Sequence, residues 1–483
     1  NVTFVDADNT SGAEDGTAEH PYNTIEEAID QAVGQMIYVF NAGTPYLENV
    51  MLKDGQILWG SGCLIPALNG RSFGSGIFPT LDGQSKGPTV TMANNTTVAG
   101  LRISNTLVEG APSMVVLLPA LGNMDISRVG VFGNGANNLT VQCNEITGND
   151  HGAVLVRNSG NFTTTIRNNR VEHNSAYGMI VGGQGANGSF RLRAEGNHFN
   201  DNHLRGLVIL AENYDDVIVG LVDNQANRNG LAGIEMILNG RDYVLANIAG
   251  VTAEDNNGSG ITSFLNSPDG FAIGLFGPPA GLFDLLDMAA GLAGESPLSE
   301  EDMDIFSGSG PVAVSRNRDD NLSSVVQGWE LALAGYFDIQ ANDCPNGFGI
   351  RSVVTSEGGV AVAAFARSDY LMSLLEAGAD VINSQLGLDP PIVMPAYAAS
   401  SPLEANRNYK GISSRVHGEI FAFTGFLGVE ANNSTFGHGI ESFVWNFDHG
   451  SGSAASVFAR VTASGNNSSG IDSFTGGDSM GIA

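Results

Sequence analysis

A repeat between Asn144 and Phe264 constrains the fold more than any other feature of the chain. Each of four copies begins with two asparagines five residues apart, and a glycine three or four residues later opens an apolar segment. The glycines of successive copies stand at positions 152, 178, 206, 233 and 260, so the period is 26 to 28 residues. Such a period, with one Asn-rich turn and β-rich segments in every copy, is typical of a solenoid. The sequence therefore predicts an all-β solenoid rather than a set of globular domains.

The asparagines themselves are expected to be structural. The pairs are Asn144 and Asn149, Asn169 and Asn174, Asn197 and Asn202, and Asn224 and Asn229. Amide side chains in equivalent turns of stacked coils can hydrogen-bond to one another and to the turn backbone. We therefore predict an asparagine ladder, with a role in ligand binding as the alternative.

A second version of the repeat continues to the end of the sequence. The segment Val251–Phe264 is nearly reproduced by Val461–Phe474, and a Gly-Ile-x-Ser signature begins at positions 260, 349, 411, 439 and 470. The two longest steps predict insertions at 266–335 and 366–400, each carrying an apolar stripe at helical spacing. The stripes are Leu282, Leu285, Leu286 and Ala289, and Leu371, Leu374, Leu375 and Ile382. We expect two helices on the flank of the coil, with a projecting lid or docking surface as the alternative.

The first fifty residues predict how the coil begins. Asn23 or Thr24 can cap a helix over 25–32, and Met36–Phe40 reads as a buried strand. The run from Asp15 to Ile29, followed by Ile37–Phe40 and Tyr46–Val50, resembles the start of a right-handed parallel β-helix of the pectin-lyase-like superfamily. The resemblance implies one β-helix domain over 1–483 whose open N-terminal end is covered by the helix. Members of that superfamily include lyases, hydrolases, epimerases, tailspikes and adhesins, so the resemblance predicts the fold and not the activity.

The charge of the chain limits its partners. Lys and Arg number 21 against 51 Asp and Glu, and the formal net charge is -30. Such an acidic protein repels nucleic acid and anionic membrane surfaces, and the sequence has no apolar run long enough to predict a membrane span. We expect an extracellular or cell-surface protein. The expected partners are a polysaccharide or further copies of the chain.

Three cysteines are too few and too scattered for a disulfide framework or a zinc site. Cys63, Cys143 and Cys344 are interpreted as small core residues. The alternative is a bridge from Cys143 to another turn of the coil.

Lyase chemistry on this fold needs acidic residues for calcium and a basic group near the reacting carbon. The best group of this kind in the repeat region predicts a binding site, formed by Asp215, Asp216, Asp223, Arg228, Arg241 and Asp242. Asp319 and Asp320, beside Arg316 and Arg318, are the predicted metal ligands, with calcium as the cofactor. The alternative for both groups is an ordinary polar surface turn.

Hydrolase chemistry would need two or three carboxylates on neighbouring turns. Asp150 and His151 stand in the Asn-rich turn, and His173 and His203 fall in neighbouring copies of it. Water-exposed turn residues are the alternative interpretation, and the sequence assigns no catalytic residue.

These patterns favour an extracellular structural or surface-binding protein that self-associates or forms part of a longer chain. The regular repeat Val461–Phe474 is followed by 475–483 without a capping pattern, which predicts further chain or stacking of another copy by strand addition. The alternative is a calcium-assisted polysaccharide lyase or a glycoside hydrolase acting on an acidic glycan.

Overall fold

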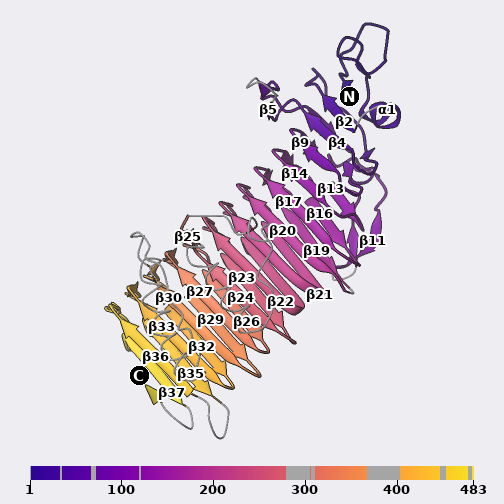
Figure 1. Cartoon of the computed structure of the whole chain (residues 1–483). Helices are drawn as coiled ribbons and strands as arrows, with labels where there is room; N and C mark the ends of the chain where they lie inside the picture. Colours follow the sequence, from indigo (N-terminus) through magenta and orange to yellow (C-terminus); the bar gives the residue numbers. More distant parts are fainter. Residues whose placement is uncertain are drawn as a thin grey trace. The chain divides into compact units, whose positions relative to one another are not determined.

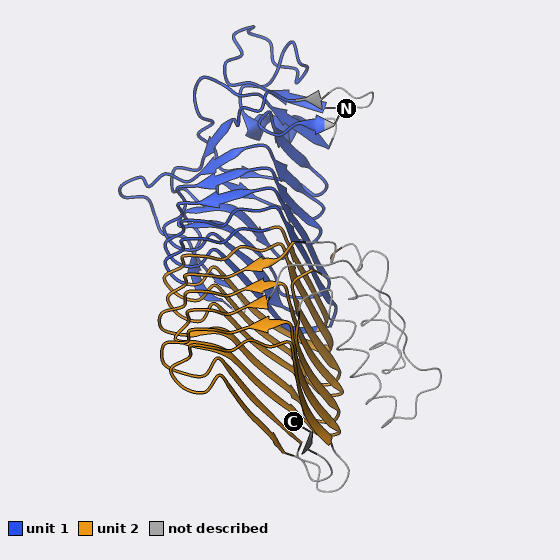
Figure 2. Ribbon diagram, turned by 90° about the vertical axis from the view of Figure 1, so that its left-hand side faces the viewer, with its two compact units in different colours: residues 1–214, 224–231 blue, residues 215–223, 232–483 orange. Residues whose placement is uncertain are grey.

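The computed structural model describes residues 2–32, 35–66, 72–118, 121–185, 187–278, 305, 310–366, 403–446, 453–476 and 481–482. Figure 2 distinguishes two compact units, which we describe separately. The first contains residues 1–214 and 224–231, and the second contains 215–223 and 232–483. The prediction of one domain over 1–483 stays a prediction.

Three parallel strand ladders form the first unit (Figure 1). The first ladder contains β1 (Val2–Val5), β2 (Met36–Val39), β4 (Ile57–Gly60), β9 (Thr97–Ala99), β14 (Leu139–Gln142), β17 (Phe162–Arg167) and β20 (Ser189–Glu195). The second contains β3 (Val50–Met51), β8 (Val90–Thr91), β13 (Val129–Asn134), β16 (His151–Arg157), β19 (Met179–Gln184) and the first half of β21 (Leu207–Val222). The third contains β7 (Thr80–Asp82), β10 (Arg102–Ser104), β15 (Glu145–Thr147) and β18 (Arg170–Glu172).

Two antiparallel hairpins interrupt these ladders. One joins β5 (Ile65–Pro66) to β6 (Ser72–Phe73), and the other joins β11 (Val115–Leu118) to β12 (Gly122–Asp125). All pairing within the three ladders is parallel, and a complete coil such as β13–β14–β15 contributes one strand to each ladder. The predicted parallel β-helix is therefore confirmed in this unit.

Helix α1 (Ile25–Gln31) coincides with the helix predicted over 25–32. Thr24 caps it, because its Oγ1 accepts a hydrogen bond from the Glu27 backbone nitrogen at 3.2 Å. The Glu48 carboxylate accepts two more, from the backbone nitrogens of Ile25 at 3.1 Å and Glu26 at 2.9 Å. A negative group at this end also complements the helix dipole. The predicted role of α1 as a cover for the end of the coil stays a prediction.

The predicted asparagine ladder is confirmed, and the first unit contains two of them. In the first, Asn144, Asn169, Asn197 and Asn224 are linked by Nδ2–Oδ1 hydrogen bonds of 3.1, 3.0 and 2.9 Å. In the second, Asn149, Asn174, Asn202 and Asn229 are linked by bonds of 3.0, 3.0 and 3.2 Å. All eight side chains are buried. Because a buried amide without partners is costly, each coil fixes the position of the next.

The repeat glycines let neighbouring turns approach closely. A Cβ added at Gly178 would lie 2.4 Å from the Gly206 carbonyl oxygen and 2.8 Å from Asn202 Nδ2. Gly178→Ala is therefore expected to destabilise the first unit by about 1–3 kcal/mol, because backbone must shift to admit the methyl group. A shift of the urea midpoint measures this cost. At Gly274, the matched control, an added Cβ meets only side-chain carbons at 3.3 and 3.4 Å. Equal midpoints for Gly178→Ala and the unsubstituted protein would contradict the close-approach argument.

The second unit repeats the same three-ladder plan. Its first ladder contains the first half of β22 (Ile234–Ala249), then β23 (Ile261–Ser267), β26 (Leu322–Gly328), β29 (Phe348–Ser356), β32 (Lys410–Gly418), β35 (Ile440–Asn446) and β37 (Ile471–Gly476). Its second contains the second half of β22, then β24 (Phe271–Phe276), β27 (Leu331–Phe337), β30 (Val360–Ala366), β33 (Phe421–Leu427), β36 (Ser453–Ala459) and β38 (Gly481–Ile482). The third contains β25 (Val312–Ala313), β28 (Ile339–Gln340), β31 (Leu403–Glu404) and β34 (Val429–Glu430).

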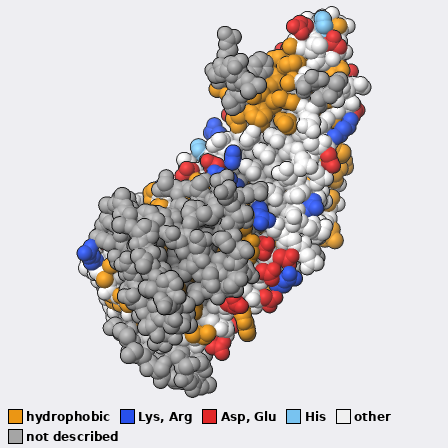
Figure 3. Space-filling view, viewed as in Figure 1, with side chains coloured by type: hydrophobic (Ala, Val, Ile, Leu, Met, Phe, Trp, Pro, Cys, Tyr) orange, Lys and Arg blue, Asp and Glu red, His pale blue; other side chains and the backbone are white. Residues whose placement is uncertain are grey.

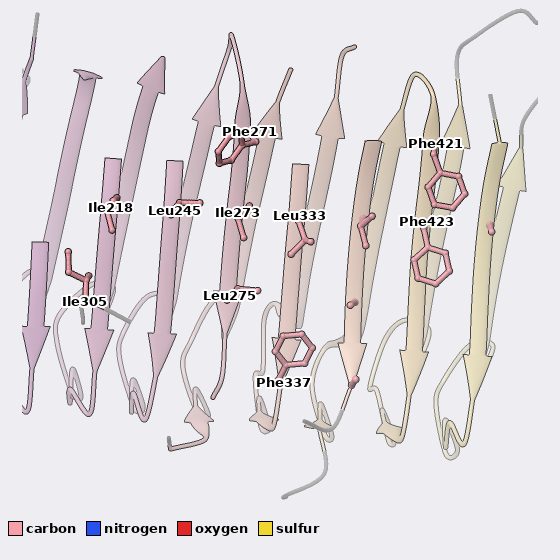
Figure 4. Close-up of a cluster of buried hydrophobic side chains, with 14 residues drawn as sticks. Ile218, Leu245, Phe271, Ile273, Leu275, Ile305, Leu333, Phe337, Phe421 and Phe423 are labelled. Atoms are coloured by element: carbon pink, nitrogen blue, oxygen red, sulfur yellow. The ribbon is translucent and has the colours of Figure 1, made fainter. Parts of the chain in front are cut away.

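A column of stacked aromatic rings lies along the second of these ladders. Phe276, Tyr336, Phe365, Phe426 and Phe458 stack in order, with ring centroids 5.1, 4.6, 4.7 and 5.0 Å apart. A separate apolar cluster on the same strands includes Phe271, Ile273, Leu333 and Phe423 (Figure 4). The core of this unit therefore contains a longer aromatic column than the first unit, in which the buried rings of Phe162, Phe190 and Tyr214 pack in order.

The two predicted helical insertions are not supported by the described residues, in which α1 is the one α-helix. Within 266–335, the strands β24, β26 and most of β27 belong to regular ladders. Both predicted apolar stripes, at 282–289 and 371–382, lie outside the described residues. Ile305 is described and packs into the apolar cluster of Figure 4.

Candidate functional site

Three chemically active side chains occupy one position of the repeat in the first unit. His151, Tyr177 and Arg205 each stand immediately before the repeat glycine, on successive coils. The Gly152 nitrogen donates to the Tyr177 carbonyl at 3.0 Å, and the Gly178 nitrogen donates to the Arg205 carbonyl at 2.9 Å. The rings of His151 and Tyr177 stack with centroids 5.5 Å apart and planes at 20°. We call these three residues, all half-buried, the His-Tyr-Arg row.

An ion pair stands next to this row. Arg128 Nη1 lies 2.5 Å from Asp150 Oδ1, and only 18% of the arginine side chain is exposed. Arg128 also donates to the backbone carbonyls of Asn105 at 3.2 Å and Gly148 at 3.4 Å, while Ser175 Oγ donates to Asp150. These contacts hold the Asp150 side chain in place beside His151.

His151 is suited to accept a proton at neutral pH. Burial lowers the pKa of its imidazole below the usual 6.5, while the charges of Asp150 and Asp125 act in the opposite direction. Its Nδ1 atom is buried and finds no hydrogen-bond partner among the described residues. A neutral imidazole is the form that a general base requires.

The β11–β12 hairpin packs beside the row. Its residues Leu118 and Met124 join an apolar cluster with Ile180, and Tyr177 packs against the same cluster. Asp125 ends the hairpin. Although burial would raise its pKa, hydrogen bonds from Ser113 Oγ and the backbone nitrogens of Ser127 and Met114 lower it to about 2. Asp125 is therefore a permanent negative charge at neutral pH.

An aromatic surface forms a second feature of the first unit. Phe4, Tyr38 and Trp59 are register partners on β1, β2 and β4. Phe40 lies 5.7 Å from Phe4 and 5.1 Å from Tyr38, measured between ring centroids. Figure 3 shows apolar side chains gathered over this N-terminal part of the unit. Rings of this kind supply apolar contact area.

Part of the binding site predicted from the sequence is brought together in the second unit. Arg241 Nη2 lies 2.6 Å from Asp215 Oδ1, and Arg241 Nε lies 3.2 Å from Asp242 Oδ1. Asp216 follows Asp215 on β21 and is half-buried. The Arg241 side chain is 50% exposed, so this is a surface ion-pair group of small energetic weight.

The other two residues of that predicted site, Arg228 and Asp223, contact residues outside it. Arg228 forms a bidentate ion pair in the first unit with Asp201, at 2.8 and 2.7 Å. Asp223 has a positive φ of 53°, and its carboxylate occupies the space that a Cβ at Gly250 would fill. Whether any of the six residues binds a ligand stays a prediction.

The two predicted metal ligands, Asp319 and Asp320, make different contacts in the structure. Asp320 Oδ1 accepts a hydrogen bond from the Phe348 backbone nitrogen at 2.9 Å, and burial raises the pKa of this carboxyl. The neighbouring Asp319 accepts a hydrogen bond from Cys344 Sγ through its backbone carbonyl. Across the described residues, no group of three or more His, Cys, Asp or Glu side chains is arranged to hold a metal ion. Calcium binding stays a prediction.

The strand pairing defines the class of protein: the chain is a parallel β-helix protein, the fold that the resemblance predicted. No protein-family model matches the sequence, and no curated protein matches it either. The AlgE4 A-module of Azotobacter vinelandii mannuronan C-5 epimerase is similar over 98% of this chain and 100% of its own, with 12% identity and a TM-score of 0.36. The catalytic domain of a GH87 α-1,3-glucanase is similar over 94% of this chain and 67% of its own, with 12% identity and a TM-score of 0.35. Another similar structure is the GH136 lacto-N-biosidase of Eubacterium ramulus, with 11% identity, coverage of 95% and 68%, and a TM-score of 0.29.

At such low identities and TM-scores these similarities carry no argument about function, so the candidate site rests on the contacts described above. Among the described helices and strands, no helix is long and apolar enough to cross a membrane.

Proposed function

We propose that this protein is a polysaccharide lyase acting on an acidic glycan, with the His-Tyr-Arg row as its active site. The observation that carries the proposal is the alignment of a neutral histidine, a tyrosine and an arginine on three successive coils. The ring centroids of the histidine and the tyrosine lie 5.5 Å apart. Cleavage of a uronate chain by elimination needs these three functions: a base, an acid and a cation for the sugar carboxylate.

Each side chain has one task in this reaction. His151 removes the proton from the carbon that bears the sugar carboxylate, and Arg205 holds that carboxylate while charge develops on it. The C–H electron pair becomes a carbon–carbon double bond as the neighbouring glycosidic C–O bond breaks. Tyr177 gives its hydroxyl proton to the departing oxygen. Arg128 and Asp150 are positioning residues, because they hold the turn that carries His151.

A glycoside hydrolase is a poorer match to the same residues. Such an enzyme needs one carboxyl group that stays protonated until it protonates the leaving oxygen. Hydrogen bonds lower the pKa of Asp125 to about 2, and Asp150 is paired with Arg128 at 2.5 Å. Asp125 is therefore unable to supply that proton at neutral pH.

No step of the proposed reaction passes through calcium, because the described residues near the row offer no set of ligands for it. The structural or surface-binding role, self-association and an extracellular location stay predictions. Polysaccharide as the partner is part of the present proposal.

The proposed function is tested by incubating the protein with a panel of uronic-acid glycans and following ultraviolet absorbance. Elimination leaves an unsaturated sugar that absorbs, whereas hydrolysis releases reducing ends without absorbance. The proposal expects absorbance and reducing ends to rise together on at least one acidic glycan. Reducing ends without absorbance would establish a hydrolase instead, and inactivity across the panel would favour a binding or structural role.

The rate of this reaction is expected to fall at acidic pH. His151 must be neutral to accept a proton, and burial lowers its pKa below 6.5. Activity is therefore retained above the pKa of the folded protein and lost as the pH falls through that value. Measurement of kcat/KM between about pH 4 and 8 should give an acid limb with a midpoint below 6.5. An acid limb centred above 6.5 would contradict a buried histidine as the base.

A further inference from the structure

Two cysteines far apart in the sequence meet beside Gly100 in the first unit. Cys63 follows β4 and Cys143 follows β14, and both of those strands pair with β9, which Gly100 follows. The Gly100 nitrogen donates to the Cys143 carbonyl at 3.0 Å, and a Cβ added at Gly100 would lie 3.0 Å from the Cys63 Cβ. Because Gly100 has no side chain, the two thiols approach each other closely enough for each to shift the pKa of the other.

The backbone of both cysteines is held in place. Trp59 Nε1 donates to the Cys63 carbonyl at 3.0 Å, and the Cys143 nitrogen donates to the Arg167 carbonyl at 2.8 Å. Both side chains are half-buried, so a small oxidant can approach them. This placement corrects the interpretation of Cys63 and Cys143 as core residues.

The third cysteine is in a different state. Cys344 is buried, and its thiol donates to the Asp319 carbonyl. Burial raises its pKa to about 11, whereas the Cys63 thiol lowers the pKa of Cys143. Cys143 is thus the better nucleophile, and Cys344 serves as an internal reference.

We propose that Cys63 and Cys143 form a disulfide under oxidising conditions, stapling β4 to β14 across β9. The Cys143 thiolate attacks one sulfur of a disulfide oxidant such as glutathione disulfide and displaces one glutathione thiolate. The Cys63 thiolate then attacks the Cys143 sulfur of this mixed disulfide and releases the second glutathione. Two protein thiols lose two electrons and two protons, and one glutathione disulfide becomes two glutathione thiols. The bond closes the loop of chain between residues 63 and 143, which restricts the unfolded state.

The test uses the full chain, reduced completely and then exposed to glutathione disulfide. Free thiols are alkylated in denaturant, and tryptic peptides are analysed by mass spectrometry. The proposal expects peptide 54–71 linked to peptide 129–157, while Cys344 in peptide 319–351 is alkylated. Three alkylated cysteines after oxidation, or a linked peptide that contains Cys344, would overturn it.

Thermal unfolding supplies the second measurement. The oxidised chain should unfold about 5 °C or more above the reduced chain. Cys344→Ser should keep this difference, and Cys63→Ser and Cys143→Ser should each remove it. Equal unfolding temperatures for the oxidised and reduced proteins would contradict a staple that constrains the fold. Because the peptide linkage is mapped on the unsubstituted chain, the result does not depend on whether a variant folds.

Discussion

His151→Ala should reduce kcat/KM on the cleaved glycan by about 10²- to 10⁴-fold, the contribution expected of a general base. The alanine leaves the backbone bonds of the turn in place, because the contacts between coils at this position are made by Gly152 and Asp150 main-chain atoms. The loss should fall mainly on kcat, since the imidazole acts on the proton in transfer rather than on distant sugars.

His198→Ala is the matched control for this variant. His198 is exposed in the first unit and belongs to the third face of the coil. Its backbone forms isolated parallel β-bridges with Arg170 and Gln225. It should keep full activity. Retention of activity by His151→Ala, with both variants folded by circular dichroism, would remove His151 from the catalytic role.

Asn174→Asp should cost about 3 kcal/mol or more of the unfolding free energy of the first unit. Asn174 Nδ2 donates to Asn202 Oδ1 at 3.0 Å and to the Ile146 carbonyl at 3.3 Å, at a site with 2% exposure. One oxygen of a carboxylate there would keep the two donors of Asn149, but the other oxygen would face two acceptors in place of the lost amide donor. Urea unfolding at neutral pH measures the loss.

The pH dependence of this variant provides a second readout. The carboxyl group that Asn174→Asp introduces is buried, and one of its oxygens faces two acceptors, which favours its protonated form, so its folded pKa rises above the unfolded value of about 3.9. The destabilisation is smallest below the unfolded pKa and grows as the pH rises toward the folded pKa. Asn123→Asp, at an exposed position of β12, should change the midpoint little. A neutral-pH midpoint for Asn174→Asp equal to that of this control would contradict the ladder argument.

The repeat and the helix were predictable because their signals are local or strictly periodic. Asn174 and Asn202 are recognisable as partners by their spacing alone, and hydrogen bonds join them. Thr24 marks the start of α1 because a threonine side chain before the first helical residue, here Ile25, can accept a hydrogen bond from a backbone nitrogen of the first turn. Both predictions depend on rules that need no knowledge of distant contacts.

The candidate site was less predictable because neighbours in a solenoid are one period apart in the sequence. Grouping charged residues by proximity found Arg241 with Asp242, but it missed Arg228 with Asp201, which lie 27 residues apart. Tyr177 and Arg205 were missed for the same reason, since three different residue types share the position before the repeat glycine. An alignment of the copies at that glycine would have found them, because it places residues of different chemical types at the same position of the repeat.

The asparagine ladders have a consequence for how such a chain can change its length. Every asparagine offers the next coil the same pair of bonding groups that it receives from the coil before it. A duplication or deletion of one complete period within 144–229 therefore presents matching partners at both junctions. A duplication or deletion that ends within the five-residue spacing of an asparagine pair would instead leave buried amides without their partners. Genetic growth of this protein is therefore favoured by whole coils, although the coils themselves differ in length by a few residues.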